Sequence, residues 1–287
     1  MLKVEERQGG VVVYGLDIDL KNTFECGQCF RWNAEPDGSY TGVAYGKALN
    51  VSEIGDGMLY LKDTSKKDLE DTWYYYFDMD KDYSSIAEAL KGDEILDKAM
   101  RMGRGIRILR QDPWECLISF IISANNRIPQ IKRVVENICR SYGDPVDYMG
   151  RTYYTFPGPE RLAAVDEETL KETRCGFRAS YIIEAARMVQ QGFDLKAIYE
   201  MDIDEARSRL KEIPGVGDKV ADCILLFAYG KTQAFPVDVW VKKVLTQLYG
   251  FKDSNIDRIR RFAESKFGDY AGYAQQYLFY YMREKAM

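Results

Sequence analysis

The sequence predicts an α+β protein in which an N-terminal antiparallel sheet domain precedes a mainly α-helical domain. Short apolar runs separated by turn signals, such as Pro36-Asp-Gly38, dominate residues 1 to about 83 and are typical of strands. From Ser84 onward, apolar residues recur with the period of a helix. A chain of 287 residues can hold two modest cores. We therefore expect one domain over 1–83 and a second over 84–287.

About five strands are expected in the first domain, with little helix before Lys67. Leu16–Leu20 alternates apolar and acidic residues, as a half-buried strand should. The other expected strands are Val11–Tyr14, Tyr40–Tyr45, Ala48–Val51 and Met58–Leu61. The aromatic run Trp73–Phe77 stands where strands give way to helices, so we expect it to pack in a core or between the domains.

The second domain is expected to be a succession of helices around one buried helix. Asp112 and Pro113 are typical of an N-cap and a first turn, and Trp114–Ala124, which follows them, is apolar nearly all round. We place that segment at the centre of the domain. The other expected helices are 84–90, 131–142, 160–164, 167–173, 180–191, 204–211, 219–229, 239–249, 256–267 and 270–284.

Composition removes several function classes. The chain has no histidine, which excludes Ser-His-Asp hydrolases and enzymes with a histidine base or a histidine-bound zinc. Six scattered cysteines fit reduced thiols better than a disulfide framework. No apolar run approaches a membrane span or a signal peptide, so we expect a cytoplasmic protein. The net charge of −5 argues against indiscriminate coating of nucleic acid but leaves room for a local basic face.

A glycine-rich turn, Ile213-Pro-Gly-Val-Gly217, lies between two predicted helices and gives a helix-hairpin-helix pattern over about 204–229. Gly215 and Gly217 would let the backbone turn sharply and approach a ligand. Backbone N–H groups of such a turn, at the start of a helix, form an anion site suited to a DNA phosphate. The alternative is a plain connector between two helices.

Lys219 and Asp238 are the candidate catalytic residues. Lys219 falls in the first turn of the second hairpin helix, where the helix dipole disfavours a charged ammonium. Partial burial against Val220 and Phe235 would add to that effect and give a usable nucleophile. Asp238 follows nineteen residues later and is typical of an N-cap for the next helix. A cap alone is the competing interpretation of Asp238.

The hairpin, the lysine and the aspartate at this spacing resemble the helix-hairpin-helix DNA glycosylase superfamily, and more narrowly the 8-oxoguanine DNA glycosylases. The resemblance covers nearly the whole chain, because several separated motifs occur in the family's order. These motifs are Cys26–Trp32, Leu109–Pro113, Ser123–Asn126, Cys175–Tyr181 and Tyr270–Gln275 followed by Phe279. The resemblance implies a TBP-like N-terminal sheet domain and a helical glycosylase domain.

The resemblance also implies a chemistry that needs no histidine. A damaged base is flipped out of the duplex, since its glycosidic bond cannot be reached inside the stack. Lys219 would displace the base from C1′ and form a Schiff base with the sugar. Asp238 would stabilise positive charge on the sugar and orient the attack. The imine acidifies the C2′ proton, so the same enzyme would cleave the strand by β-elimination.

Contacts with the base and with DNA follow by the same resemblance. The Gly27 carbonyl would accept the N7–H that 8-oxoguanine carries and guanine lacks. Phe279 and Cys223 would sandwich the flipped ring, and Gln275 would hydrogen-bond its Watson–Crick edge. On the DNA side, Phe177 would fill the vacated stack, and Asn125 and Arg178 would hold the orphaned cytosine. Seen alone, Phe279 is equally an ordinary core aromatic, Arg178 a solvated charge and Gln275 a surface amide.

The expected partner is double-stranded DNA containing 8-oxoguanine, bound by a monomer that has no membrane contact and associates with the nucleoid while scanning. No cofactor is expected to be required. The backbone carbonyls of Lys211, Ile213 and Val216 match the hairpin's site for a structural K⁺ or Na⁺ ion, and no side chain is expected to bind a metal. No cysteine follows Cys223, which excludes the iron–sulfur branch of the superfamily.

Three positions depart from the eukaryotic pattern. Trp240 stands where those members have a histidine near the phosphate of the damaged nucleotide, and Met282 stands where they have the acid that pairs with it. Losing both together is coherent, because the acid alone would be a buried unpaired charge. Gln130 stands near their cytosine-reading arginine. We therefore expect weaker discrimination by the opposite base.

Other readings stay open at this point. The chain could be a helix-hairpin-helix protein that binds DNA without catalysis, or a glycosylase for a different damaged base. A monofunctional alkylbase glycosylase would not need the lysine. Cys26 and Cys29 could form a thiol redox pair or half of a zinc site, although no second paired-cysteine motif is present.

Overall fold

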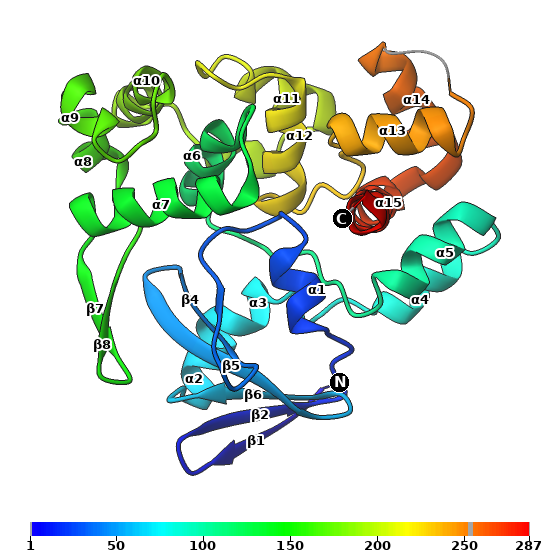
Figure 1. The fold of residues 1–287 in the computed structure, drawn as a ribbon, viewed down its shortest axis with the longest axis horizontal. Coiled ribbons are helices and arrows are strands. Elements are labelled where there is room, and N and C mark those ends of the chain that lie inside the picture. The colour runs from blue at the N-terminus through cyan, green and yellow to red at the C-terminus, as the bar shows by residue number, and fades with distance from the viewer. Residues whose placement is uncertain (1, 252–254, 287) are drawn as a thin grey trace.

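The N-terminal part of the chain folds as a six-stranded antiparallel sheet. The computed structural model describes residues 2–251 and 255–286. The strands are β1 (Lys3–Arg7), β2 (Gly10–Tyr14), β3 (Asn33–Ala34), β4 (Tyr40–Ala44), β5 (Lys47–Gly55) and β6 (Met58–Lys62). Their order is β1-β2-β6-β5-β4-β3, and every neighbouring pair is antiparallel. The sheet lies below the helices in Figure 1. The predicted α+β class is confirmed.

The strand predicted at Leu16–Leu20 is wrong. The carboxylate of Asp19 instead accepts a hydrogen bond from the Asn22 backbone nitrogen at 2.7 Å and caps α1 (Leu20–Glu25). Aspartate is among the strongest N-caps, and five alternating residues are too few to outweigh it. The edge strands β1 and β3 were not predicted, because their sequences are mostly polar and exposed.

The aromatic run Trp73–Phe77 packs in the core of the sheet. Packing in a core was one of the two predicted alternatives, and packing between the domains was the other. It follows α2 (Lys66–Asp68), spans the end of a π-helical turn (Leu69–Trp73) and continues into α3 (Tyr74–Tyr76). Trp73, Tyr76 and Phe77 are buried.

A helical array lies above the sheet in Figure 1. Its elements are α4 (Tyr83–Ala89), α5 (Glu94–Met102), α6 (Pro113–Ser123), α7 (Ile128–Tyr142), α8 (Pro159–Ala163), α9 (Glu167–Lys171), α10 (Arg178–Gln190), α11 (Ile203–Leu210), α12 (Asp218–Phe227), α13 (Val239–Gln247), α14 (Ile256–Phe267) and α15 (Ala271–Ala286), with short 3₁₀ turns at Ala197–Tyr199 and Gly268–Tyr270. Asp112 caps α6, and every residue of α6 from Trp114 to Ser123 except Glu115 is buried. The expected central helix is confirmed.

Helix α5 and the two strands of a second sheet were also not predicted from the sequence. Helix α5 begins after the cap Asp93, whose carboxylate accepts from the Ile95 and Leu96 nitrogens. Strands β7 (Pro145–Tyr148) and β8 (Arg151–Tyr154) form a separate hairpin that reaches down beside the sheet (Figure 1). The Tyr148 hydroxyl donates to the Lys62 carbonyl at 2.6 Å, so this hairpin ties the helical array to β6.

Two buried clusters meet along the segment Cys26–Trp32. Cys26 and Phe30 belong to the large cluster of the helices, whereas Cys29 and Trp32 belong to the cluster of the sheet. The predicted boundary between a domain over 1–83 and a domain over 84–287 stays a prediction. Within those two ranges, residues 1, 252–254 and 287 lie outside the described residues. Over residues 2–251 and 255–286, no helix is long and apolar enough to cross a membrane.

Helix α15 returns the end of the chain to its beginning. The Tyr280 hydroxyl donates to the Asn22 side chain at 2.6 Å, and the Gln276 amide donates to the Cys26 carbonyl at 3.1 Å. Figure 1 shows α15 close to α1, α12 and α13. This meeting of distant segments surrounds the candidate site.

Candidate active site

A cavity of about 970 Å³ opens where the sheet part and the helices meet. Its walls come from α1, α6, α7, α12, α13, α15 and the loops after α1 and α6. The cavity brings together most of the residues predicted from the sequence, namely Gly27, Asn125, Lys219, Cys223, Asp238, Trp240, Gln275 and Phe279. Phe177, Arg178, Gly215 and Gly217 do not line it.

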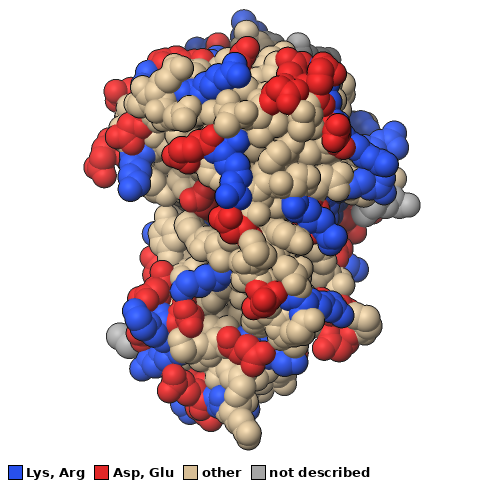
Figure 2. All heavy atoms as spheres, turned by 90° about the vertical axis from the view of Figure 1, so that its left-hand side faces the viewer, with Lys and Arg blue, Asp and Glu red and all other residues tan. Residues whose placement is uncertain are grey.

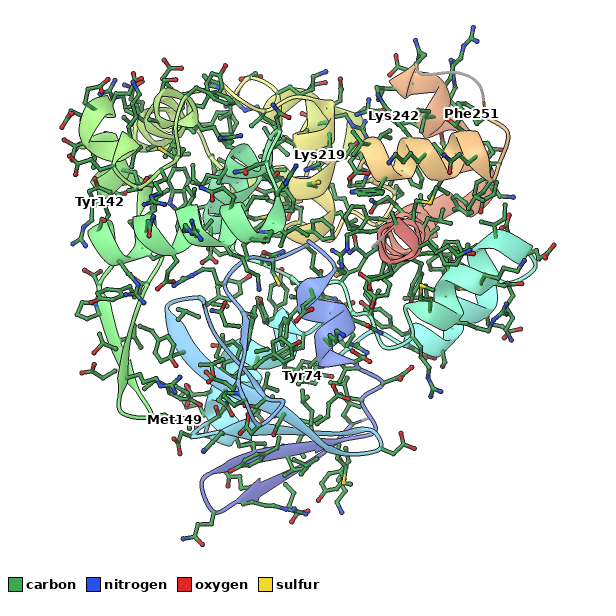
Figure 3. The ribbon with its side chains drawn as sticks, in the orientation of Figure 1. Tyr74, Tyr142, Met149, Lys219, Lys242 and Phe251 are labelled. Atoms are coloured by element: carbon green, nitrogen blue, oxygen red, sulfur yellow. The ribbon has the colours of Figure 1, made fainter. Side chains whose placement is uncertain are left out.

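Lys219 lies in the first turn of α12, as predicted, and faces α6 (Figure 3). Its Nζ atom is 3.2 Å from the Ser123 hydroxyl and 5.2 Å from the centre of the Phe120 ring. The Cys223 thiol follows one turn later on the same helix. Burial raises the pKa of that thiol to about 12, and the neighbouring Lys219 opposes the rise. The thiol is therefore neutral, which disfavours it as a nucleophile.

Asp238 is both an N-cap and a cavity residue. Its Oδ1 atom accepts hydrogen bonds from the Trp240 nitrogen at 2.9 Å and the Val241 nitrogen at 2.8 Å, so it caps α13. Burial raises the pKa of the carboxyl, against the two capping hydrogen bonds and the charge of Lys219. Because both capping bonds use Oδ1, the Oδ2 atom takes neither. The two interpretations of Asp238 are compatible.

The segment from α11 to α12 has the predicted helix-hairpin-helix form, but its two glycines differ in conformation. Gly215 has φ +85°, and a methyl group there would lie 3.0 Å from the Tyr181 side chain. Gly217 has an extended backbone with φ −98° and faces open space. The turn therefore requires glycine at 215 only. Gly217 caps α12 without a side-chain hydrogen bond, which leaves the first-turn N–H groups of α12 for an anion.

Gly27 and Phe279 are neighbours in the wall of the cavity. Gly27 has φ +82°, and a methyl group on it would lie 3.3 Å from Ile128 Cδ1 and 3.5 Å from Phe279 Cε1. A side chain at 27 would therefore crowd both the backbone and the Phe279 ring. The Phe279 side chain is partly buried and packs against the buried cluster of the helices, so both interpretations of Phe279 stay open.

Gln275 is buried, with 4% of its surface exposed, and is not the surface amide of the alternative reading. Its Oε1 atom has no hydrogen-bond partner among the described residues. A buried acceptor without a partner costs free energy, and a ligand in the cavity can supply the missing donor. The side-chain amide of the next residue, Gln276, donates a hydrogen bond to the Cys26 carbonyl.

Phe177 and Arg178 lie outside the cavity at the start of α10. Phe177 is 59% exposed, which is unusual for a large aromatic side chain. Arg178 is 8% exposed, so it is not a solvated charge. Its guanidinium donates to the carbonyls of Ala124 and Asn125 and lies 4.4 Å from the Phe177 ring centre. Arg178 thus braces the loop after α6 and supports Phe177, and its predicted contact with cytosine stays a prediction.

The structure places the three residues that depart from the eukaryotic pattern. Trp240 lines the cavity, and the Lys243 ammonium stands 4.3 Å from its ring centre. Met282 is buried, with 9% exposed, so no acid faces this corner from that position. Gln130 is half-buried in the first turn of α7.

The Cys26–Cys29 pair behaves as core. Both thiols are buried and free, and their Sγ atoms hydrogen-bond to the carbonyls of Thr23 and Phe24. Burial raises the pKa of both thiols, which disfavours the reactive thiolate. Among the described residues, no group of three or more acidic or cysteine side chains is placed to hold a metal ion. The structure thus gives no support to a redox pair or a zinc half-site.

Comparison with protein families accounts for both parts of the chain. Residues 11–117 match the 8-oxoguanine DNA glycosylase N-terminal domain, and residues 118–267 match the HhH-GPD superfamily of base excision DNA repair proteins. The chain belongs to the 8-oxoguanine DNA glycosylase family. The border between the two matches falls within α6.

Individual relatives agree with this assignment. The probable N-glycosylase/DNA lyase of Methanothermobacter thermautotrophicus is 35% identical over 245 residues, 78% of each chain. The N-glycosylase/DNA lyase OGG1 of Arabidopsis thaliana is 32% identical over 92% of this chain and 77% of the relative. Among solved structures, MBOgg1 with a low-affinity DNA ligand has a TM-score of 0.97 at 50% identity over 100% of both chains. The Clostridium acetobutylicum 8-oxoguanine glycosylase/lyase, bound to DNA with cytosine opposite 8-oxoG, has a TM-score of 0.96 at 42% identity over 99% of both.

Two positioning residues escaped the sequence interpretation in this family member. Gln28 is fully buried beside Gly27, and its amide donates to the carbonyls of Thr23 at 2.9 Å and Arg107 at 2.7 Å. Its Oε1 atom accepts from the Leu109 nitrogen at 2.9 Å, and its carbonyl accepts from the Gln111 amide at 2.7 Å. Gln28 therefore fixes the loop that presents Gly27. The sequence around Gln28 carries no local pattern that indicates this positioning role.

The second is Asp222, on α12 between Lys219 and the end of the helix. It is 1% exposed and pairs with Arg207 of α11 at 2.7 Å and with Arg260 of α14 at 3.0 Å. Arg260 also reaches Asp218, which pairs with Lys211 at 2.9 Å. This clamp holds the helix that carries Lys219 between its two neighbours.

Surface charge is mixed on the side of the molecule that Figure 2 shows. Lys and Arg side chains are interspersed there with Asp and Glu, so that face carries no field of one sign. Indiscriminate coating of nucleic acid needs an extended basic surface. This face does not supply one.

Proposed function

We propose that the chain excises 8-oxoguanine from duplex DNA and then cleaves the strand at the resulting site, as a bifunctional DNA glycosylase and lyase. The observation that carries the proposal is the placement of the Lys219 amine and the Asp238 carboxylate in one cavity that can hold a purine. The family membership and the names of the relatives support the same activity. The chain has no histidine, so a lysine mechanism is one of few available to it.

The chemistry follows from these two groups. The amine of Lys219 attacks C1′ with its lone pair, the bond from C1′ to the base breaks, and the base leaves with the bonding electrons and takes the proton that the amine gives up. The ionised Asp238 carboxylate stabilises the positive charge that develops on the sugar. Ring opening gives an imine between Lys219 and C1′. Loss of the C2′ proton then expels the 3′ phosphate by β-elimination, and hydrolysis of the imine frees the lysine.

The substrate is recognised by groups around the cavity. The Gly27 carbonyl accepts the N7–H of the flipped base, a proton that guanine does not have. The unpartnered Gln275 Oε1 atom accepts from the Watson–Crick edge, which carries N–H groups. Phe279 and Cys223 hold the two faces of the ring. Guanine would leave the Gly27 acceptor without its donor, and the penalty discriminates against it.

DNA is held by features outside the cavity. The exposed Phe177 ring enters the stack that the flipped nucleotide vacates, and Asn125 and Arg178 hold the loop beside the orphaned cytosine. The first-turn amides of α12 take a backbone phosphate. Trp240 lies near the phosphate of the damaged nucleotide. The chain works as a monomer in the cytoplasm, on the nucleoid.

A monovalent cation, K⁺ or Na⁺, fits the hairpin as a structural ion. The carbonyls of Lys211, Ile213 and Val216 are neutral oxygen donors at the end of α11 and in the turn, where helix carbonyls lack intrahelical partners. Such a set suits a hard ion of low charge. The ion would steady the turn, and the reaction requires no cofactor.

Borohydride trapping tests the proposal. Incubating the protein with a duplex containing 8-oxoguanine and borohydride should give a covalent protein–DNA adduct. Lys219→Gln should abolish the adduct. Lys98→Gln, which removes an exposed lysine of α5 paired with Glu94, should keep it. An adduct in Lys219→Gln, or none in the unmodified protein, would overturn the mechanism.

The outcomes also separate the alternatives. Salt-sensitive DNA binding with no adduct on 8-oxoguanine or abasic duplexes would indicate a protein that uses the hairpin only to bind phosphates. An adduct on abasic DNA without excision of 8-oxoguanine would indicate a glycosylase for another damaged base.

A further inference from the structure

Three side chains of α15 form a stripe along the cavity. Gln275, Phe279 and Arg283 are four residues apart, so they lie on one face of the helix, one above the other. All three line the cavity. Eight residues of helix rise about 12 Å, which matches the long dimension of a purine with its exocyclic groups. The aromatic platform is in the middle of the stripe, and a polar group is at each end.

Both polar ends hold a buried atom without a hydrogen-bond partner among residues 2–251 and 255–286. At one end it is the acceptor Oε1 of Gln275, and at the other it is the donor Nη1 of Arg283. The Arg283 side chain is only 13% exposed, and its Nη2 atom pairs with Glu284 at 2.9 Å. Buried donors and acceptors are rarely left unpaired, and a ligand is one way to satisfy them.

Arg283 stands at the end of the stripe next to the Gly27 loop. Its guanidinium carbon lies 5.6 Å from the Phe279 ring centre and the same distance from the Tyr280 ring centre. A methyl group on Gly27 would lie 3.5 Å from Cε1 of the same Phe279 ring. The guanidinium and the Gly27 loop therefore approach the same aromatic ring.

The pattern of donors and acceptors fits one orientation of 8-oxoguanine. Its Watson–Crick edge carries N1–H and N2–H donors, which suit the Gln275 acceptor. The opposite edge carries the N7–H donor, which suits the Gly27 carbonyl, and the O8 acceptor, which needs a donor of its own. Guanine has a C8–H group in place of O8. Arg283 is the cationic donor at that end of the stripe.

We propose that Arg283 donates a hydrogen bond to O8 of the flipped 8-oxoguanine and so reads the lesion oxygen directly. This contact rests on the proposed function, and it adds a second group that recognises the substrate. The base is then checked at two adjacent positions, N7–H by a main-chain acceptor and O8 by a charged donor. Guanine fails both checks, because it would leave the Gly27 carbonyl and the Arg283 guanidinium unpaired.

Equilibrium binding tests the contact without turnover. In a Lys219→Gln background, fluorescence anisotropy gives affinities for three duplexes, which carry 8-oxoguanine, guanine or a tetrahydrofuran abasic analogue opposite cytosine. Arg283→Met keeps an apolar stem over the aromatic rings and removes the donors, and Arg283→Lys keeps a charge. Lys285→Met, an exposed change on the same helix, is the matched control.

A contact with O8 affects only one duplex. Arg283→Met should weaken binding of the 8-oxoguanine duplex by roughly tenfold or more, the usual range for a hydrogen bond to a charged group. Binding of the other two duplexes should stay constant, and Arg283→Lys should recover part of the loss. Lys285→Met should leave the ratio of 8-oxoguanine to guanine affinities as it is.

Two results would overturn the inference. An equal loss on all three duplexes would place Arg283 on the DNA backbone or in the fold, and an unaltered affinity ratio would show that O8 is not read by Arg283. Borohydride trapping on abasic DNA, with Lys219 intact, separates this failure from failure of the proposed function. If Arg283→Met still gives the adduct, the lysine mechanism stands whatever the binding ratio shows.

Discussion

The Asp238 carboxylate both caps α13 and lines the cavity. As an N-cap it satisfies two backbone N–H groups of α13, and as a cavity residue it places negative charge near Lys219. Burial raises the pKa of its carboxyl. An acid with a raised pKa stabilises the fold fully below its ordinary value of about 3.9, and the contribution is lost as pH rises through the raised value. At neutral pH the ionised group therefore costs stability.

Asp238→Asn should raise the melting temperature at pH 7 while excision falls about 10²–10³-fold. Asparagine caps a helix as well as aspartate does, and it carries no buried charge. The loss of excision is that expected when one stabilising group is removed from a transition state. Thermal denaturation at pH 7 and pH 4 and single-turnover excision measure both effects, and the gain in melting temperature should shrink toward pH 4.

Asp238→Ala supplies the contrast, since it removes the charge and the cap together. It should be less stable than Asp238→Asn by about 1 kcal/mol. A melting temperature for Asp238→Asn below that of the unmodified protein at pH 7 would contradict the account.

At the scale of elements, buried ion pairs of Asp222 join α12 to α11 and α14. Asp222→Asn should destabilise the fold by about 3–5 kcal/mol, because it breaks a buried pair and leaves Arg207 and Arg260 without their shared carboxylate. It should also slow trapping by Lys219 more than it weakens DNA binding, since α12 carries the amine. Denaturant unfolding and trapping rates at saturating DNA measure the two.

Asp204→Asn is the matched control for the clamp. Asp204 also pairs with Arg207, but its side chain is 87% exposed. Exposed pairs contribute little, so this variant should stay within about 1 kcal/mol of the unmodified protein. Equal effects of the two substitutions would show that burial of Asp222 does not matter.

Elements with local signals could be predicted, and elements without them could not. The caps Asp112 and Asp238 mark α6 and α13 in the sequence because a side chain and its helix are neighbours along the chain. At Asp19 the same chemistry was outweighed by a false alternation. Strands β7 and β8 owe their place to contacts with β5 and β6 that are remote in sequence. Gln28 and Asp222 likewise act through partners that no local pattern reveals.

At the scale of the molecule, the cavity joins Gly27 to Phe279 from opposite ends of the chain. Neither composition nor periodicity brings these two residues together, and their association came from the resemblance of whole motifs to a family. The structure adds what the resemblance could not give. Within residues 2–251 and 255–286, the Gln275 Oε1 acceptor and the Arg283 Nη1 donor have no hydrogen-bond partner.

The opposite strand should be read weakly. Gln130 stands near where eukaryotic members place an arginine that reads the opposite cytosine, so we expect a base contact worth about 1–3 kcal/mol to be missing. Single-turnover excision of 8-oxoguanine opposite C, A, G and T should therefore differ within about tenfold. Gln130→Arg should widen the spread in favour of C. A preference for C as steep as in the eukaryotic type, in the unmodified protein, would refute this.

The Gly27 loop has a consequence for how specificity in this chain can change. The atom that we propose to read N7–H is a main-chain oxygen, so no substitution at position 27 deletes it; a substitution can only displace it. The position of that oxygen is set by the four hydrogen bonds of Gln28 to Thr23, Arg107, Leu109 and Gln111. A change in base preference must therefore arise in the scaffold behind the loop, where mutations cost folding, or on the opposite wall of the cavity, where side chains can be exchanged one at a time.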